Sequence, residues 1–294
     1  AVIDLELLRQ KAEQLKELLG ECRLCPRECR AERLEGERGR CGAGEAVEIS
    51  GYGPHFGEEP PLVGEGGSGT IFFSFCSLRC VFCQNYHTSR GKDARPVSMK
   101  ELTEIMLGLQ RRGCVNINLV TPAHFLPQIL EALLGARERG LELPLVYNSS
   151  GYERLEVLRE LEGIVDIYLP DLKYADAAAA KRYSRIEDYP TVARAAVKEM
   201  HRQVGDLLLD EQGVAVRGLL IRHLVLPGGL AGTEELMRFI AEEVSPACWI
   251  NIMDQYYPAY LAHRYPEINR RVSREEFQAA IRAARRASRG FHLL

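Results

Sequence analysis

Three cysteines, Cys76, Cys80 and Cys83, lie close together in the segment FCSLRCVFCQN. They follow the apolar run TIFFSF at residues 70–75, which predicts a strand, so the cysteines belong to the loop after it. A [4Fe–4S] cluster normally takes four cysteine ligands, and a set of three leaves one iron free to bind another molecule. The spacing C-x3-C-x2-C therefore predicts a cluster that takes part in chemistry.

A structural zinc site is the alternative for the same loop. His87 follows Cys83 closely enough to complete a Cys3His set. Structural zinc usually draws its ligands from two separated knuckles rather than from one loop at the end of a strand. The iron–sulfur interpretation is therefore preferred.

Polar side chains recur at the ends of further predicted strands. Apolar runs at residues 115–120, 144–148, 164–169, 219–226 and 248–253 each predict a strand. The polar residues at or near their ends are Thr121, Asn148, Ser149, Asp171, Lys173, Arg222 and Gln255. Ligands of α/β proteins bind at the carboxyl ends of parallel strands, so these residues are expected to share a site with the three cysteines. A Ser at such a junction is also a common helix cap, and Arg222 in an apolar strand requires a partner.

A second cysteine set lies near the N-terminus, at Cys22, Cys25, Cys29 and Cys41. Four thiolates close a tetrahedral shell, which suits structural zinc or a fully ligated iron–sulfur cluster, and the spacing does not decide between them. A metal here would stabilise a segment too short to fold around a core of its own. The two isolated cysteines, Cys114 and Cys248, are interpreted as core residues.

The alternation of apolar runs and helical patterns predicts an α/β protein. Six strand–helix units favour a partial (β/α)6 TIM-like barrel, with a doubly wound sheet as the alternative. Helix caps are predicted at Ser98 with Glu101 and at Ser273 with Glu276. The Gly- and Pro-rich stretch at residues 51–69 predicts a loop, and it divides the chain into an N-terminal cysteine-rich metal-binding module (1–64) and a main domain (65–294).

Composition excludes several classes of function. The chain has 294 residues and a net charge of -3, which gives no general attraction to nucleic acid, and the arginines of the last helix are interpreted as a solvated face. No apolar run approaches the roughly 18 residues that span a bilayer, and the N-terminal segment resembles a charged amphipathic helix rather than a signal peptide. We therefore expect a cytoplasmic enzyme without a membrane partner.

The cysteine triad, with Phe82 directly before the third cysteine, resembles the motif of the radical S-adenosylmethionine superfamily. The segments YNSSGY, DLK and IRHLVLPGG resemble pyruvate formate-lyase activating enzyme, and HFGEEPPLVGEGGSGTIFF, CQN and NIMDQYYPAY resemble a poorly characterised activator-like subfamily. The resemblance implies that the residues contacting S-adenosylmethionine are Phe82, Asn148, Ser149, Asp171, Lys173, Arg222 and Gln255, with Thr121 replacing a glycine- and glutamate-containing motif.

The resemblance also implies a reaction and partners. The cluster would cleave S-adenosylmethionine reductively to a 5′-deoxyadenosyl radical, which abstracts hydrogen from a substrate. The substrate would be a glycyl-radical enzyme or, alternatively, another peptide or a small molecule. The expected electron source is a low-potential donor such as flavodoxin or ferredoxin. The alternative from another class is an electron-transfer iron–sulfur protein, which leaves Asp171, Lys173 and Arg222 without a purpose.

Overall fold

The computed structural model describes residues 4–294. The strands are β1 (Val47–His55), β2 (Ser68–Phe73), β3 (Arg95–Val97), β4 (Ile117–Val120), β5 (Leu145–Ser149), β6 (Ile167–Pro170), β7 (Leu208–Leu209), β8 (Ala215–Leu224), β9 (Trp249–Met253) and β10 (His292–Leu293). The α-helices are α1 (Leu5–Glu17), α2 (Pro60–Val63), α3 (Tyr86–Ser89), α4 (Met99–Arg111), α5 (Leu126–Glu138), α6 (Leu155–Arg159), α7 (Ala177–Ser184), α8 (Tyr189–Val204), α9 (Thr233–Phe239) and α10 (Arg274–Ala287). Short helical turns are η1 (Arg33–Glu35), η2 (Ala123–Phe125), η3 (Pro227–Gly229), η4 (Ile240–Val244), η5 (Ala262–Arg264) and η6 (Pro266–Ile268).

Six parallel strands form the centre of the sheet, in the order β2-β4-β5-β6-β8-β9. They are the six strands predicted from the sequence, and they lie side by side in chain order. A doubly wound sheet would reverse direction at an internal strand. The observed order is therefore compatible with a partial (β/α) barrel and not with the doubly wound alternative.

The edges of the sheet differ from the prediction. Residues 51–55, expected as a loop, continue β1, which pairs antiparallel with β2, and α2 forms at residues 60–63. The glycines and Pro54 of this segment weaken the strand pattern in the sequence. On the side of β1 that faces away from β2, β3 pairs only with residues 47–49. Pro54 therefore lies where β1 is the edge strand of the sheet, and its missing N–H removes no hydrogen bond between strands. The division at residues 64 and 65 remains a proposal.

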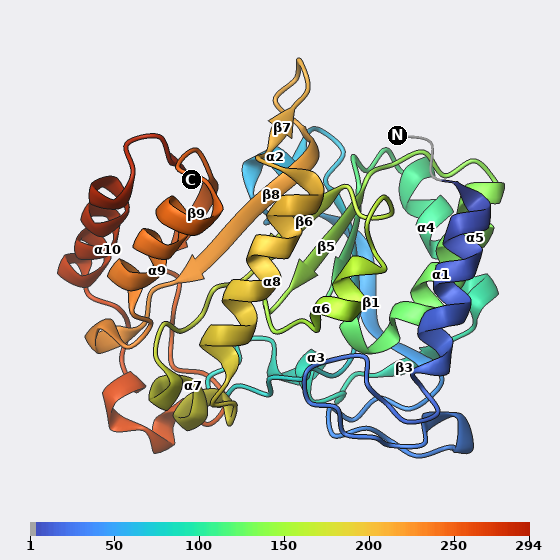
Figure 1. The fold of residues 1–294 in the computed structure, drawn as a ribbon, viewed down its shortest axis with the longest axis horizontal. Helices are drawn as coiled ribbons and strands as arrows, with labels where there is room; N and C mark the ends of the chain where they lie inside the picture. The colour runs from blue at the N-terminus through green and yellow to red at the C-terminus, as the bar shows by residue number, and fades with distance from the viewer. Residues whose placement is uncertain (1–3) are drawn as a thin grey trace.

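Two apolar clusters hold the sheet. The larger one packs the helices against the outer face, where α4, α5 and α8 cover the strands and α1 lies on α5 (Figure 1). The smaller cluster fills the concave side, where Leu62 of α2 packs among Val146, Ile167, Leu169 and Leu220. Leu62 is fully buried, so α2 closes the amino-terminal end of the half-barrel.

The helix caps follow the sequence with one correction. Ser273 and Glu276 form the reciprocal capping box of α10. Ser98 accepts from the Glu101 amide at the start of α4, but Glu101 pairs with Arg95 instead of returning the bond. Within residues 4–294, no helix combines the length and apolar character that a bilayer crossing requires.

The loops after the parallel strands gather at one end of the sheet, the lower edge in Figure 1. α3 and α7 lie at this edge, together with residues 18–46, a loop-rich segment coloured blue. The segment that carries the four N-terminal cysteines therefore lies at the same end as the triad loop. Cys114 and Cys248 are buried, as predicted.

Candidate active site

A cavity of about 220 Å³ lies at the carboxyl ends of the parallel strands. Its lining includes all of the residues predicted as ligands of the triad cluster or of S-adenosylmethionine, namely Cys76, Cys80, Phe82, Cys83, Thr121, Asn148, Ser149, Asp171, Lys173, Arg222 and Gln255. These residues come from the ends of five strands, β4, β5, β6, β8 and β9, and from the loop after β2. The fold thus brings together side chains that lie almost 180 residues apart in the sequence.

Close backbone packing holds the cysteine loop in place. Phe75, at φ 75°, begins the loop and donates its amide to Thr88 of α3. A Cβ atom at Gly91, which itself has φ +65°, would lie 2.2 Å from the Phe75 ring. The loop is therefore positioned by contacts that only glycine permits at residue 91.

The three cysteine thiols of the loop line the cavity, with Cys80 buried and Cys76 and Cys83 partly exposed. Burial raises the pKa of all three, and the positive charge of Lys173 opposes that shift at each of them. The Cys80 Sγ lies 2.9 Å from the Ser184 Oγ, which in turn lies 2.8 Å from the Tyr174 hydroxyl. A thiolate formed at this loop would thus have a cation and a chain of hydroxyl groups beside it.

The donor set fits an iron–sulfur cube. In a [4Fe–4S] cluster each cysteine binds a different iron atom, so the ligands surround the cube and do not converge on one ion. Within residues 4–294, no group of three or more His, Cys, Asp or Glu side chains is placed to hold a single metal ion. His87, the fourth ligand of the zinc alternative, does not line the cavity, and its Nδ1 lies 3.4 Å from Asp93 on the surface.

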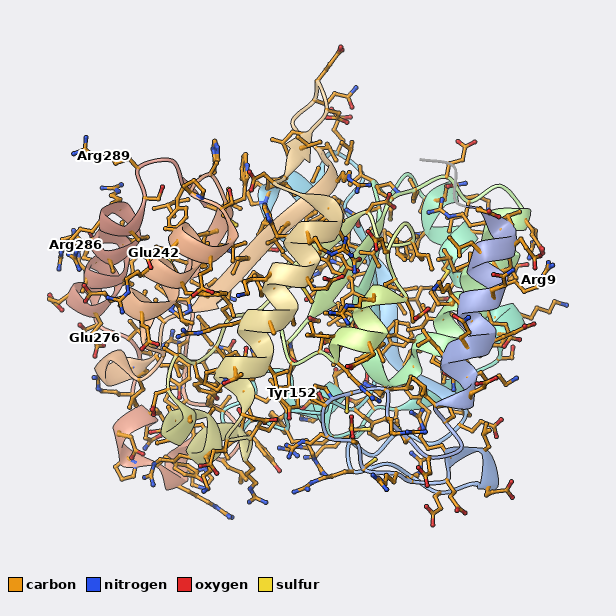
Figure 2. The ribbon with its side chains drawn as sticks, in the orientation of Figure 1. Arg9, Tyr152, Glu242, Glu276, Arg286 and Arg289 are labelled. Atoms are coloured by element: carbon orange, nitrogen blue, oxygen red, sulfur yellow. The ribbon has the colours of Figure 1, made fainter. Side chains whose placement is uncertain are left out.

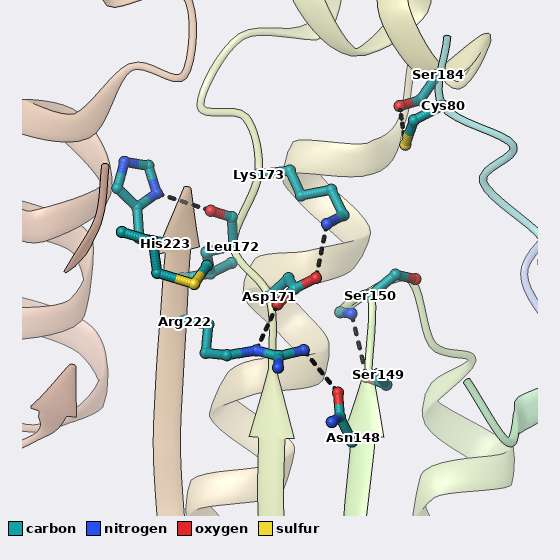
Figure 3. Close-up of polar contacts among 12 residues, drawn as sticks. Cys80, Asn148, Ser149, Ser150, Asp171, Leu172, Lys173, Ser184, Arg222 and His223 are labelled. Carbon is teal, nitrogen blue, oxygen red and sulfur yellow. Dashed lines mark hydrogen bonds and ion pairs between the residues drawn. The ribbon is translucent and has the colours of Figure 1, made fainter. Parts of the chain in front are cut away.

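Asp171 is the centre of a network beside the cysteines (Figure 3). Its carboxylate lies 2.6 Å from the Lys173 Nζ and 2.8 Å from the Arg222 Nε. The Arg222 Nη2 also donates to the Asn148 side chain at 2.6 Å. Burial alone would raise the pKa of Asp171, but Arg222 and Lys173 outweigh it and lower that pKa. The partner that the sequence required for Arg222 is therefore Asp171, one strand away.

The remaining predicted residues occupy different parts of the cavity wall. Phe82 is buried with its ring against Tyr174, Tyr183 and Tyr256, so much of its surface packs in the core. Gln255 is exposed and its carbonyl accepts from Gln84.

Two residues shape the turns after their strands. Ser149 accepts from the Gly151 amide at 3.1 Å and so forms a turn; it is not the helix cap that the sequence offered as an alternative, because the N-cap of α6 is Arg154. Thr121 has φ 57° and donates its amide to the Asn148 carbonyl. Both side chains nevertheless belong to residues that line the cavity.

Two glutamates extend the network beneath Arg222. Glu58 lies 3.7 Å and Glu59 4.0 Å from the guanidinium, and Asn251 of β9 donates to Glu59 at 3.0 Å. From the sequence, the loop position of both glutamates allows either a role in a substrate pocket or as proton carriers, or plain solvent exposure, and nothing in the sequence marks Asn251. Burial raises the pKa of Glu58 to about 7, aided by Glu59 and Asp171 and opposed by Arg222. A pair of acids directly before the apolar run PPLV was the available clue to their burial.

The four N-terminal cysteines lie outside this cavity. Cys22, Cys25 and Cys41 are buried, Cys29 is partly exposed, and none forms a disulfide. The Arg33 guanidinium donates to the Cys22 sulfur at 3.6 Å, and the Ala43 amide donates to the Cys41 sulfur at 3.5 Å. A Cβ atom built on Gly39 would lie 3.4 Å from the Cys29 sulfur and 3.6 Å from that of Cys41, so these two thiols face the same point.

The tetrad loop contacts the triad loop directly. Arg27, between Cys25 and Cys29, donates to the Ser77 carbonyl at 3.1 Å, and the Arg79 side chain donates to the Arg40 carbonyl. Arg38 lies over the ring of Phe75. The two cysteine-bearing loops therefore pack as neighbours.

The chain resembles a known protein family and known proteins. Residues 70–208 match the family described as Radical SAM superfamily. The chain is 34% identical over 288 residues to the uncharacterised protein MJ0674 of Methanocaldococcus jannaschii, covering 95% of this chain and 78% of that protein. A crystal structure of methylornithine synthase aligns with 16% sequence identity and a TM-score of 0.48, over 74% of this chain and 62% of that one.

The matched segment begins in β2 and includes the triad loop together with Asn148, Asp171 and Lys173. The superfamily uses a [4Fe–4S] cluster to cleave S-adenosylmethionine to a 5′-deoxyadenosyl radical. The chain belongs to the radical SAM superfamily, in one family with the archaeal protein, and is an enzyme of radical chemistry.

Proposed function

We propose that the cavity at the strand ends is the reaction centre, with Cys76, Cys80 and Cys83 as the ligands of the cluster. The cluster, when bound, supplies the single electron that cleaves S-adenosylmethionine. The observation that carries this proposal is that three thiols from one loop and a charged network from neighbouring strands line one cavity. An electron-transfer protein has no need of such a network.

The charged residues have complementary tasks in this proposal. S-adenosylmethionine carries an ammonium, a carboxylate and a ribose, so it requires both acceptors and cations. Asp171 offers carboxylate oxygens to the ammonium, and Lys173 and Arg222 offer positive charge to the carboxylate. The contacts of Asp171 with both cations hold all three groups ready, which lowers the cost of ordering them on binding. Asn148 fixes the guanidinium plane.

We propose that the hydrogen donor enters from the open end of the same cavity. The likeness of YNSSGY, DLK and IRHLVLPGG to activating enzymes supports a backbone glycine of a partner protein as the donor. A peptide or small-molecule substrate is the alternative.

We further propose a second metal centre at Cys22, Cys25, Cys29 and Cys41. Burial of three of the four thiols and the shared approach of Cys29 and Cys41 to Gly39 support it. Either structural zinc or a fully ligated iron–sulfur cluster would satisfy four cysteines, but the four side chains do not surround a single ion in the described residues, so zinc would require them to draw together. Metal analysis of Cys80→Ala separates this centre from the triad, because the substitution removes a ligand of the triad cluster. About one zinc atom or about four iron atoms per chain in this variant would then belong to the tetrad. Absence of both metals would overturn the second centre.

Chromatography for 5′-deoxyadenosine tests the main proposal. Protein reconstituted with iron and sulfide under anaerobic conditions and reduced chemically should form 5′-deoxyadenosine from S-adenosylmethionine, and Cys80→Ala should form none. Cys114→Ala, at a buried cysteine outside both sets, is the matched control and should retain activity. Colourless wild-type protein with zinc bound at the triad would overturn the proposal.

The substrate proposal needs its own experiment. Incubation with a candidate glycyl-radical enzyme should give a glycyl signal in electron paramagnetic resonance. Formation of 5′-deoxyadenosine with no glycyl signal from any candidate would reject activation and leave a peptide or small molecule as the hydrogen donor.

A further inference from the structure

Five arginines surround a second cavity, of about 270 Å³, on the outside of the triad loop. We call this surface the outer arginine face, and its arginines are Arg27, Arg40, Arg79, Arg90 and Arg185. Leu78 and Arg79 line both this cavity and the reaction cavity, and Ser184, also in its lining, contacts the Cys80 sulfur at 2.9 Å. The triad loop is thus the wall between the two cavities.

The charge of this face is not neutralised within the chain. Among residues 4–294, none of the five arginines has a carboxylate oxygen within 4.0 Å, although the chain has 41 acidic and 38 Lys and Arg residues. By contrast, Arg202 pairs with both Glu162 and Glu199.

The hydrogen bonds of the face go to backbone carbonyls. Arg27 donates to Ser77, Ser184 and Arg185, while Arg79 donates to Arg40 and Arg90 to Arg79. Carbonyl groups orient a guanidinium without cancelling its charge. The Nε of Arg90 is buried and has no partner within the described chain. The result is a cationic surface in which the backbone orients Arg27, Arg79 and Arg90.

The location of this face indicates what it recognises. Arg27 and Arg40 belong to the tetrad loop and Arg79 to the triad loop, so a bound partner would contact both cysteine-bearing loops. If the proposed function holds, S-adenosylmethionine and the substrate occupy the inner cavity, and an electron has to reach the cluster from the other side of the loop. Complementary charge steers such encounters and fixes their orientation.

Resting on the proposed function, we infer that the outer arginine face docks an acidic one-electron carrier protein of the flavodoxin or ferredoxin type. In each encounter the carrier is oxidised by one electron and the triad cluster is reduced by one, with no transfer of atoms. The exposed side chains of Arg40, Arg79 and Arg185 would meet carboxylates of the carrier, and Arg27 and Arg90 would hold the loops beneath them.

Equilibrium binding of an oxidised acidic flavodoxin tests this inference without turnover. The test variant is the double charge reversal Arg40→Glu with Arg185→Glu, at exposed positions outside the reaction cavity. The matched control is Arg286→Glu with Arg289→Glu, on the arginine-rich surface of α10 at the far left of Figure 2. The test variant should bind at least about tenfold more weakly and lose most of the salt dependence, whereas the control should match the wild type.

Further measurements separate this inference from loss of fold and from failure of the proposed function. Arg40→Gln with Arg185→Gln should weaken binding by an intermediate factor, and reduction by photoreduced deazaflavin should be unchanged in all variants. Unaltered flavodoxin binding by the charge-reversal variant would overturn the inference. It would also be overturned if an RNA oligonucleotide displaced the flavodoxin and the binding of that RNA required the same arginines. Absence of 5′-deoxyadenosine with the chemical reductant would instead refute the proposed function.

Discussion

Replacing Glu58 with glutamine should stabilise the folded protein above neutral pH and have little effect in mild acid. Only 8% of the Glu58 side chain is exposed, and the charged groups that face it are Arg222, Glu59 and Asp171. Burial, together with the two carboxylates, raises its pKa from 4.5 to about 7 despite the attraction of Arg222. The folded state therefore binds this proton more tightly than the unfolded chain does.

The sign and size of the effect follow from that difference. Protonated Glu58 stabilises the fold fully below the unfolded pKa of 4.5, and this contribution is lost as the pH rises through the folded pKa of about 7. A difference of about 2.5 pH units at ~1.36 kcal/mol each corresponds to about 3 kcal/mol. Glutamine keeps the shape of the protonated acid and cannot ionise, so it should avoid that loss.

Urea denaturation of the metal-free protein at about pH 5 and about pH 8 measures the difference. The free energy of unfolding of Glu58→Gln minus that of the wild type should be no more than about 1 kcal/mol at the lower pH and about 3 kcal/mol at the higher pH. The buried histidines His124 and His223 also titrate with lowered pKa values, but they are common to both proteins and cancel in the difference.

Glu243→Gln is the control, because Glu243 is half-exposed and pairs with Lys198 on the surface. It should show a much smaller change with pH. If Glu58→Gln changed the free energy of unfolding by the same amount at both pH values, the argument that burial raises the pKa of this carboxyl group would be refuted.

Three further predictions concern packing, capping and the cluster loop. Leu62→Ala should lower the free energy of unfolding by about 2–5 kcal/mol in urea denaturation, because it opens a cavity at the closed end of the half-barrel. Ser273→Ala should cost about 1 kcal/mol, measured as a lower melting temperature, and Ser273→Asp should restore it. Gly91→Ala should reduce the iron bound after reconstitution, because its Cβ would clash with Phe75, whereas Gly140→Ala has equally positive φ but open space and should bind iron normally. Equal iron content in the two glycine variants would contradict that last prediction.

Much of the fold was predictable because its signals are local. The six apolar runs became the six parallel strands, and the cap at Ser273 formed as its spacing indicated. β1 was missed because glycines and Pro54 weaken its pattern, and its stability comes from pairing with β2, which the pattern within residues 47–55 does not reveal. Glu101 was expected to complete a capping box but pairs with Arg95, since an exposed carboxylate takes whichever donor the fold brings near.

The sequence by itself predicted the chemistry of the triad, because Cys76, Cys80 and Cys83 lie within one loop and their spacing favours an iron–sulfur cluster. Only the tertiary structure decided what surrounds them. The order of the strands places Asp171 and Asn148 beside Arg222, and the position of α2 at the end of the half-barrel places Glu58 and Glu59 there. The spacing of residues within a short segment does not predict either arrangement. Burial then sets the charge of each group, and burial is a property of the packed chain rather than of any short segment of it.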